Sequence, residues 1–365
     1  MTPLAHGVLM DRRGFLSTLA AACVAARSTE VAAARRSSLW LAYTSFAVRL
    51  RYGRETPAAV PFDAVALAGM CTRVGSSGAQ VDFGQLQPGK EAIDRAAAAY
   101  RGPGLGLEVS MPARALDSPQ AYADAIATAR ALGATRARVA LLSGRRYETF
   151  ATRADWEAFA TRWRETLLRM RPEFERQRFT IGIENHKDWL APELASLLRE
   201  IDSPYVGACV DFGNNLAMLE DPDETITLLA PFAVTTHVKD MGVRVTTDGF
   251  ELSEVPLGQG ILPLARYIDV IRAARPDARF CLEMMTRDPL LVPYRTERYW
   301  APFEAAGREP ARVRRFEERV LSRATTTLPR VSGLTPERQL ALEVDNVAAC
   351  VAHACDVLHL EAPDA

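Results

Sequence analysis

The chain has 365 residues, of which 48% are hydrophobic, and its formal net charge is −1. This length and apolar content allow one large domain with a full core or two smaller domains. The near-zero charge provides no basic footprint for nucleic acid or for an anionic membrane surface, so we predict no nucleic-acid partner. The six cysteines show no CxxC spacing, which argues against a zinc knuckle and against a disulfide framework.

The first 37 residues have the character of an export leader. The sequence DRRGFL at positions 11–16 resembles a twin-arginine signal, and a weakly apolar stretch follows over 15–26. Small residues at 31–34 offer an A-x-A cleavage site. The apolar stretch is too short to span a bilayer, so we expect no stable membrane insertion. We predict a partnership with the twin-arginine export machinery and a periplasmic or secreted location. The alternative is a basic, alanine-rich disordered tail.

Eight short apolar runs follow the leader and are typical of buried parallel strands, because charge interrupts most of them only at their ends. They span residues 39–46, 79–83, 105–111, 136–142, 180–185, 206–211, 234–239 and 280–285. Helical patterns lie between most of them, at 118–132, 153–178, 192–201, 223–230 and 263–274. The helix at 118–132 begins with Ser-Pro, a cap followed by proline at the first helical position. Strand and helix in repeated alternation predict an α/β fold, a (β/α)8 TIM barrel over residues 38–285.

The residues from 286 to 365 are not needed to close such a barrel. A proline-bearing stretch starts at Arg287, residues 302–323 appear helical and highly charged, and residues 335–358 form a long final helical pattern. We expect a helical C-terminal extension that packs on the barrel wall or over its top.

Four residues stand at the C-terminal ends of the last four predicted strands: Glu184, Asp211, His237 and Glu283. Parallel strand ends meet at one face of a barrel, so these side chains are expected to converge. Three carboxylates and an imidazole suit one divalent ion, with Mn²⁺ as the first expectation and Mg²⁺, Co²⁺ or Zn²⁺ as alternatives. The four residues are therefore the predicted metal ligands.

The motifs around these residues are IENH, VDFGN, THVKD and LEM, in that order along the chain. Together they resemble the xylose-isomerase-like TIM-barrel family of sugar isomerases and epimerases, over about residues 38–285. The resemblance implies that a keto sugar chelates the bound metal, which acidifies the adjacent C–H bond. It also implies that Glu184 and Glu283 are the catalytic acid and base, one removing a proton to form a cis-enediolate and the other returning it.

Five further residues are candidates for binding the substrate. Lys239 lies two residues beyond His237 and therefore on the same strand face, with a salt bridge to Asp240 or Glu254 as its alternative role. His186 is equally placed relative to Glu184, or is an ordinary loop histidine. The set is His186, Asn214, Lys239, Glu108 and Arg287.

Two more of these candidates, Asn214 and Glu108, have structural alternatives that the sequence leaves open. Asn214 can bind a sugar hydroxyl or cap the helix that follows it. Glu108 can line the pocket or form a salt bridge to an arginine inside the barrel. Arg287, at the start of the extension, can contact an anionic or polyhydroxy substrate.

The chain also departs from the epimerase pattern. Ketose 3-epimerases acting on free sugars usually carry a histidine where this chain has Asn214 and a glutamate where it has Leu190. These positions grip the substrate, so the departures argue against a free ketohexose. The leading hypothesis is a metal-dependent isomerase or epimerase of a keto sugar or related polyol.

Two other functions stay open at this point. One is a dehydratase or lyase acting on 3-keto-glycosides or inosose-like cyclitols through the same enolate. The other is a non-catalytic periplasmic sugar-binding protein. A trinuclear zinc endonuclease of this fold is disfavoured, because only His186 and His237 of the five histidines lie at predicted barrel tips. For the isomerase, the lyase and the binding protein alike, the expected partner is a small carbohydrate. A homo-oligomer is compatible with the sequence.

Overall fold

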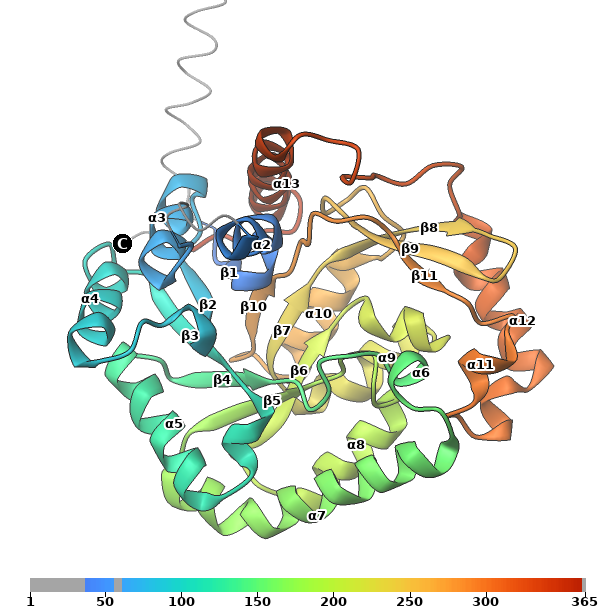
Figure 1. Ribbon diagram of the computed structural model, residues 1–365, viewed down its shortest axis with the longest axis horizontal. Coiled ribbons are helices and arrows are strands. Elements are labelled where there is room, and N and C mark those ends of the chain that lie inside the picture. Colours follow the sequence, from blue (N-terminus) through green and yellow to red (C-terminus); the bar gives the residue numbers. More distant parts are fainter. Residues whose placement is uncertain (1–36, 56–60, 363–365) are drawn as a thin grey trace, which may run out of the picture.

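The computed structural model describes residues 37–55 and 61–362 of the chain (Figure 1). The predicted leader falls outside these residues except for Ser37, so its export function stays a prediction. The Ser37 amide donates to the carbonyl of Gly75 at 2.7 Å, and its hydroxyl donates to the carbonyl of Leu360 at 2.8 Å. Ser37 is fully buried and is therefore part of the folded body.

Eight parallel strands close into a barrel, which confirms the predicted fold. Neighbouring strands follow the order β1-β10-β7-β6-β5-β4-β3-β2. Each strand overlaps one of the eight predicted apolar runs. Their bounds are β1 Trp40–Ala42, β2 Gly78–Asp82, β3 Gly106–Met111, β4 Arg136–Val139, β5 Thr180–Glu184, β6 Val206–Asp211, β7 Ala233–Val238 and β10 Arg279–Leu282.

Helices lie between the strands and surround the barrel (Figure 1). The five predicted helices agree with the observed ones within one residue at either end. Ser118 caps its helix as predicted, because its side chain accepts a hydrogen bond from the amide of Ala121 at 3.2 Å. The helices are α2 Ala47–Glu55, α3 Ala64–Val74, α4 Lys90–Arg101, α5 Pro119–Leu132, α6 Arg146–Thr149, α7 Arg153–Gln177, α8 Ala191–Ile201, α9 Pro222–Leu229 and α10 Leu264–Ala274.

The N-terminal end of the barrel is filled by one aromatic side chain. Trp40 lies in register beside Gly78, and Gly78 beside Gly106, so the three positions share one side of the sheet. A Cβ atom on Gly106 would lie 2.0 Å from the Trp40 ring, and one on Gly78 would lie 2.6 Å from it. Only glycine leaves room for this ring. The open end of the barrel is therefore the opposite one, where the predicted metal ligands lie.

A second, three-stranded antiparallel sheet was not predicted. Its order is β11-β9-β8, with β8 Asp240–Val245, β9 Phe250–Val255 and β11 Leu290–Val292. The β8–β9 hairpin is inserted between β7 and α10, directly after the end of a barrel strand. An Asp-Gly pair at 248–249 lies in its turn, and this pair was the available sequence signal.

The C-terminal extension is present and mainly helical. It contains α11 Glu297–Trp300, α12 Pro310–Arg319 and α13 Pro336–Asp356. The predicted helix at 302–323 is shorter than expected, because 3-10 turns flank α12 on both sides. The irregular stretch that starts at Arg287 also contains a short strand that was not predicted, because residues 290–292 pair with β9. Within the described residues, no helix is both long enough and apolar enough to cross a membrane.

Helix α13 is fastened to the first part of the barrel by a buried carboxylate. Glu343 accepts a hydrogen bond from the amide of Val48 at 2.6 Å and another from Arg49 Nη1 at 2.7 Å. The Glu343 side chain is fully buried. This burial raises the pKa of Glu343 to about 7, against the lowering effect of the Arg49 guanidinium.

Replacing Glu343 with glutamine should change how stability depends on pH. A carboxyl whose pKa is higher in the folded state binds its proton more tightly when folded, so the stability it contributes declines as pH rises from 4.5 toward 7. Glu343→Gln cannot titrate. The Tm of the variant minus the Tm of the wild type should therefore increase between pH 5 and pH 7.5, as measured by calorimetry. Glu337→Gln, an exposed site on the same helix, is the control. Parallel Tm curves for wild type and Glu343→Gln would contradict the prediction.

Candidate metal centre

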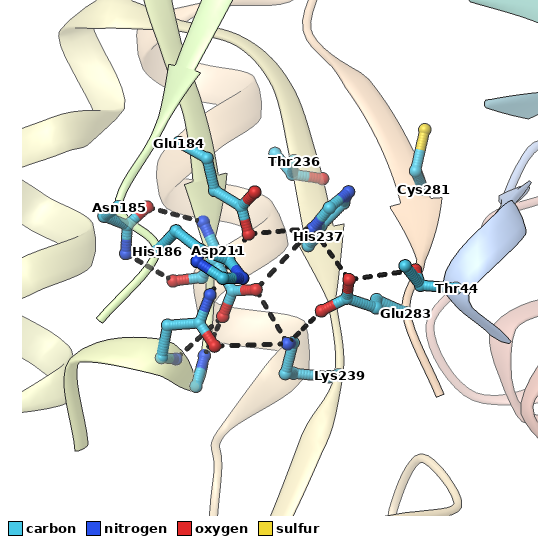
Figure 2. A network of polar contacts seen from close by, with 12 residues as sticks. Thr44, Glu184, Asn185, His186, Asp211, Thr236, His237, Lys239, Cys281 and Glu283 are labelled. Carbon is cyan, nitrogen blue, oxygen red and sulfur yellow. Dashed lines mark hydrogen bonds and ion pairs between the residues drawn. The ribbon is translucent and has the colours of Figure 1, made fainter. Parts of the chain in front are cut away.

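The four predicted metal ligands come together at the C-terminal end of the barrel (Figure 2). Glu184 ends β5, Asp211 ends β6, His237 lies in β7, and Glu283 follows β10 directly. One possible ligand atom from each lies within 4.8 Å of the others, and all four residues are buried. Strand direction explains this convergence, because each side chain projects inward where its parallel strand ends.

His237 lies at the centre of this cluster. Its Nδ1 atom is 3.1 Å from Glu184 Oε1, 3.5 Å from Glu283 Oε1 and 3.7 Å from Asp211 Oδ2. Asp211 Oδ1 accepts hydrogen bonds from the amides of Gly213 and Asn214 at 2.9 and 2.7 Å. Asp211 Oδ2 has Lys239 Nζ at 2.8 Å but no well-aligned hydrogen bond. A carboxylate oxygen whose contact is an ion pair and not an aligned hydrogen bond, beside three other possible ligand atoms, fits a divalent cation.

The charges of the cluster are held by their neighbours. Burial opposes ionisation of Glu184, but Arg138 and His237 hold its pKa well below its usual range. Burial acts the same way on Glu283, and Lys239 and His237 hold its pKa low. Burial disfavours a charged His237, yet Glu283 and Glu184 raise its pKa to about 10. Glu184 and Glu283 are therefore held ionised at neutral pH, as a cation site requires.

Arg138 is a residue of this centre that the sequence analysis missed. It forms an ion pair with Glu184 through Nε and Nη2, and its Nη1 donates to Ser110 Oγ at 3.1 Å. Its side chain is buried, so the pair is shielded from water. A charged residue inside the apolar run at 136–142 was the available signal.

A buried polar chain continues from His237 toward the middle of the barrel. His237 Nε2 lies 3.0 Å from Gln80 Oε1, and Gln80 Nε2 donates to Glu108 Oε1 at 2.7 Å. Thr235 Oγ1 donates to the same carboxylate at 2.9 Å. A carbonyl oxygen only accepts, so Nε2 carries a hydrogen and Nδ1 is the ring atom directed at the carboxylates. Gln80 was not predicted, although it is a polar residue within an apolar strand.

This chain of contacts places Glu108, which was predicted to bind substrate or to pair with an arginine. Glu108 is fully buried on β3, and its carboxylate accepts from Gln80, Thr235 and Cys281. It does not line the cavity at the barrel mouth. Its position supports His237 from behind.

A cavity of about 650 Å³ opens at the C-terminal ends of the strands. Its wall includes Glu283, His186 and Arg287, three of the predicted site residues. His186 Nδ1 lies 2.9 Å from the carbonyl of Leu142, and burial lowers the His186 pKa to about 4. Arg287 binds Glu254 of β9 through two hydrogen bonds, of 2.6 and 3.1 Å. The inserted hairpin therefore orients Arg287 at the cavity.

Lys239 and Asn214 lie inside the cluster. Lys239 pairs with Asp211 and Glu283, so neither Asp240 nor Glu254 is its partner. Asn214 Nδ2 donates to Glu184 Oε1 at 3.1 Å. Among the described residues, the side-chain bonds of Asn214 go to Glu184, Lys187 and Lys239, and not to the turn that it begins.

Lys187 is another residue that the sequence analysis missed. It is buried in the cavity wall and donates to Asn214 Oδ1. Its backbone has a φ of 58°, in the left-handed region that a lysine rarely adopts. Burial lowers the pKa of Lys187 to about 8, with further lowering by Lys239 and Arg287. The ammonium is still mostly protonated at neutral pH.

Comparison with known proteins finds one matching family and a curated relative that matches part of the chain. Residues 64–309 match the family described as "Xylose isomerase-like TIM barrel". Among curated proteins, a 3-oxo-isoapionate decarboxylase of Pectobacterium atrosepticum is 30% identical over 144 residues, which are 39% of this chain and 47% of that protein. This chain therefore matches about half the length of that relative.

Solved structures share the fold at low sequence identity. A xylose isomerase-like TIM-barrel protein of Mycobacterium smegmatis, solved with magnesium, has a TM-score of 0.53 at 16% identity, covering 72% of this chain and 95% of that one. A D-psicose 3-epimerase of Clostridium cellulolyticum H10 has a TM-score of 0.51 at 14% identity, covering 77% and 96%.

Removing Arg138 should destabilise the protein, because Glu184 would stay buried without its guanidinium partner and would keep only His237 as an ion-pair contact among the described residues. We expect Arg138→Met to lower the free energy of unfolding by about 3 to 5 kcal/mol, measured by urea titration of chelator-treated protein. The double variant Arg138→Met/Glu184→Gln no longer carries the buried glutamate charge. Its free energy of unfolding should therefore fall by less than that of Arg138→Met alone. A double variant as unstable as the sum of both single variants would show that the pair is not coupled.

Proposed function

The chain belongs to the xylose isomerase-like TIM-barrel family, and from that premise we propose that it is a divalent-metal-dependent isomerase or epimerase of a keto sugar or related polyol. The observation that carries the proposal is the buried cluster of Glu184, Asp211, His237 and Glu283 at the mouth of the barrel. The same four residues would hold the ion. Carboxylate-rich sites suit Mn²⁺ and Mg²⁺, and the Mycobacterium smegmatis protein is described with magnesium.

The two glutamates are placed for proton transfer. Glu184 and Glu283 come from β5 and β10, which are separated in the barrel by β6 and β7. Their carboxylates therefore approach the centre from different strands, on either side of His237. A bound cation would supply Lewis acidity at the substrate carbonyl. One glutamate can then take the proton from the adjacent carbon, and the other can return one to the resulting enediolate.

The surrounding residues have defined tasks in this proposal. Lys239 contacts Glu283 and Thr44 Oγ1 donates to Glu283 Oε1 at 2.9 Å, so the Glu283 carboxylate is held in one orientation. Arg138 and Asn214 hold Glu184 in the same way. Proton transfer is efficient only between groups fixed at hydrogen-bond distance, so these contacts serve positioning.

A lyase is the second candidate, and the match to a decarboxylase supports it. Loss of CO2 from a β-keto acid breaks a C–C bond, and the electron pair moves into the carbonyl to form an enolate. A proton donated by an enzyme acid to that carbon completes the reaction. The centre that stabilises an enediolate can stabilise this enolate too. The labelled product of an exchange experiment separates the two reactions.

Proton abstraction should make the enzyme exchange substrate hydrogen with solvent. Purified wild type should contain one divalent ion per chain and introduce deuterium from D2O into keto sugars or 3-keto-glycosides. Glu283→Gln should lose at least about 100-fold in exchange rate, because it removes a proton-transfer group. Mass spectrometry measures deuterium, and elemental analysis measures metal.

Glu165→Gln, an exposed glutamate on α7, is the matched control and should behave as wild type. Absence of both bound metal and exchange in the wild type would refute the enzyme proposal. It would favour a sugar-binding protein built on the same barrel.

We further propose export through the twin-arginine system, on the basis of the leader sequence alone. Replacing Arg12 and Arg13 with lysine should leave the unprocessed protein in the cytoplasm, because paired arginines are what the machinery recognises. Cell fractionation with immunoblotting checks the location and size of the protein. Lysine at both positions preserves charge, so continued export of that variant would contradict the proposal.

A further inference from the structure

Lys187 is a buried cation without an ion-pair partner. Four lysine and arginine side chains in the described residues are buried: Arg138, Arg146, Lys187 and Lys239. Arg138 pairs with Glu184, Arg146 with Glu193, and Lys239 with Asp211 and Glu283. Within the described chain, no carboxylate lies at ion-pair distance from Lys187. A buried, unpaired ammonium is costly, so a partner from outside the chain would stabilise it.

The ammonium has room and hydrogens for such a partner. Lys187 lines the cavity at the barrel mouth, and its recorded side-chain bond is the one to Asn214 Oδ1. An ammonium has three N–H donors, so two stay available. Asn214 also binds Glu184, which places the Lys187 ammonium one side chain away from the candidate metal centre. A group held there would belong to the same small molecule as the carbonyl held at the centre.

The backbone around Lys187 is built to hold this position. A φ of 58° at a lysine costs about 1 kcal/mol or more. The Lys187 carbonyl accepts from the amide of Arg146 at 2.9 Å. Asp188 Oδ1 accepts from the amides of His186 and Trp189 at 3.0 and 2.7 Å, which fixes the turn on both sides. The turn directs Lys187 to the cavity despite the backbone strain.

Four other cations line the cavity wall. Arg138, Arg145 and Arg287 have ion-pair partners, whereas the exposed Arg114 has none among the described residues. Lys187 is thus the one buried cation of the wall that has no ion pair among the described residues, and its single charge matches a carboxylate. A phosphate usually meets several donors, such as a glycine-rich loop before a helix. Among the described residues, the elements that start from this wall are short: α6, of four residues, and two 3-10 turns that begin at Tyr43 and Ala113.

We propose that the substrate is a sugar acid, whose carboxylate binds Lys187 while its keto and hydroxyl oxygens face the Glu184–Asp211–His237–Glu283 cluster. The carboxylate contact is inferred from Lys187 itself. The placement of the keto and hydroxyl oxygens at the cluster rests on the proposed function. A sugar-acid substrate explains why the chain keeps the metal centre and replaces a sugar-gripping position of free-sugar epimerases with Asn214. That asparagine holds the ammonium.

The test compares anionic and neutral ligands of the same size. Calorimetric titration of metal-loaded protein with a hexuronate and its neutral hexose, and with an aldonate and its alditol, gives a ratio of affinities for each pair. The wild type should prefer the acids. Lys187→Met should lower the acid-to-neutral ratio by roughly 10- to 100-fold, as expected for a charge-assisted hydrogen bond. Lys90→Met, an exposed lysine on α4, is the control for charge and should retain the wild-type ratio.

A second variant guards against a folding defect. Asparagine tolerates the left-handed backbone better than methionine, so Lys187→Asn should stay folded and show the same loss of preference. An unchanged ratio in both folded variants, or tighter wild-type binding of a sugar phosphate than of the sugar acid, would overturn the proposal.

Metal content and deuterium exchange, measured on the same proteins, separate this inference from the proposed function. Metal and exchange without acid preference would leave the enzyme proposal standing and remove the sugar-acid site. Acid preference that depends on Lys187, without exchange, would retain the site and remove the enzyme.

Discussion

Three carboxylates buried at one end of a barrel impose the constraint on which the rest of the site depends. Glu184, Asp211 and Glu283 converge on His237, and their mutual repulsion in a water-poor interior would be unfavourable without positive charge nearby. Arg138 and Lys239 supply this charge through ion pairs. A divalent cation would add to the same balance, so the architecture of the site and its fitness for metal have one electrostatic cause.

The barrel meets this constraint by dividing its interior into levels. Trp40 closes the N-terminal end, where Gly78 and Gly106 leave room for its ring. Above it, Gln80 and Glu108 form a hydrogen-bonded polar level that supports His237 from below. The charged centre lies at the open end, between this supported base and the cavity. The polar level orients the metal centre through the contact between Gln80 and His237.

The cavity wall comes from segments that are far apart in the chain. Arg287 of the extension is held by Glu254 of the inserted β8–β9 hairpin, and Lys187 projects from a strained turn after β5. Asn214 joins this wall to the centre through its contacts with Lys187 and Glu184. The metal centre and the cavity wall are therefore physically coupled through one asparagine. Changes of substrate within such a barrel would require this residue to change with its neighbours.

The amino-acid sequence alone determined the barrel and the convergence of four residues at its mouth. Both follow from local patterns: apolar runs of strand length alternate with helical patterns, and each strand direction is set by the next connection. The sequence could not show the partners of Arg138, Gln80 and Lys187, and it could not place Glu108 behind His237. Those contacts join β2 to β3 and β7, join β4 to β5, or link a turn to a neighbouring loop, with separations of 27 to 157 residues. Only closure of the barrel brings such distant residues into contact, so the tertiary structure decided which charges are paired and which one is left for a ligand.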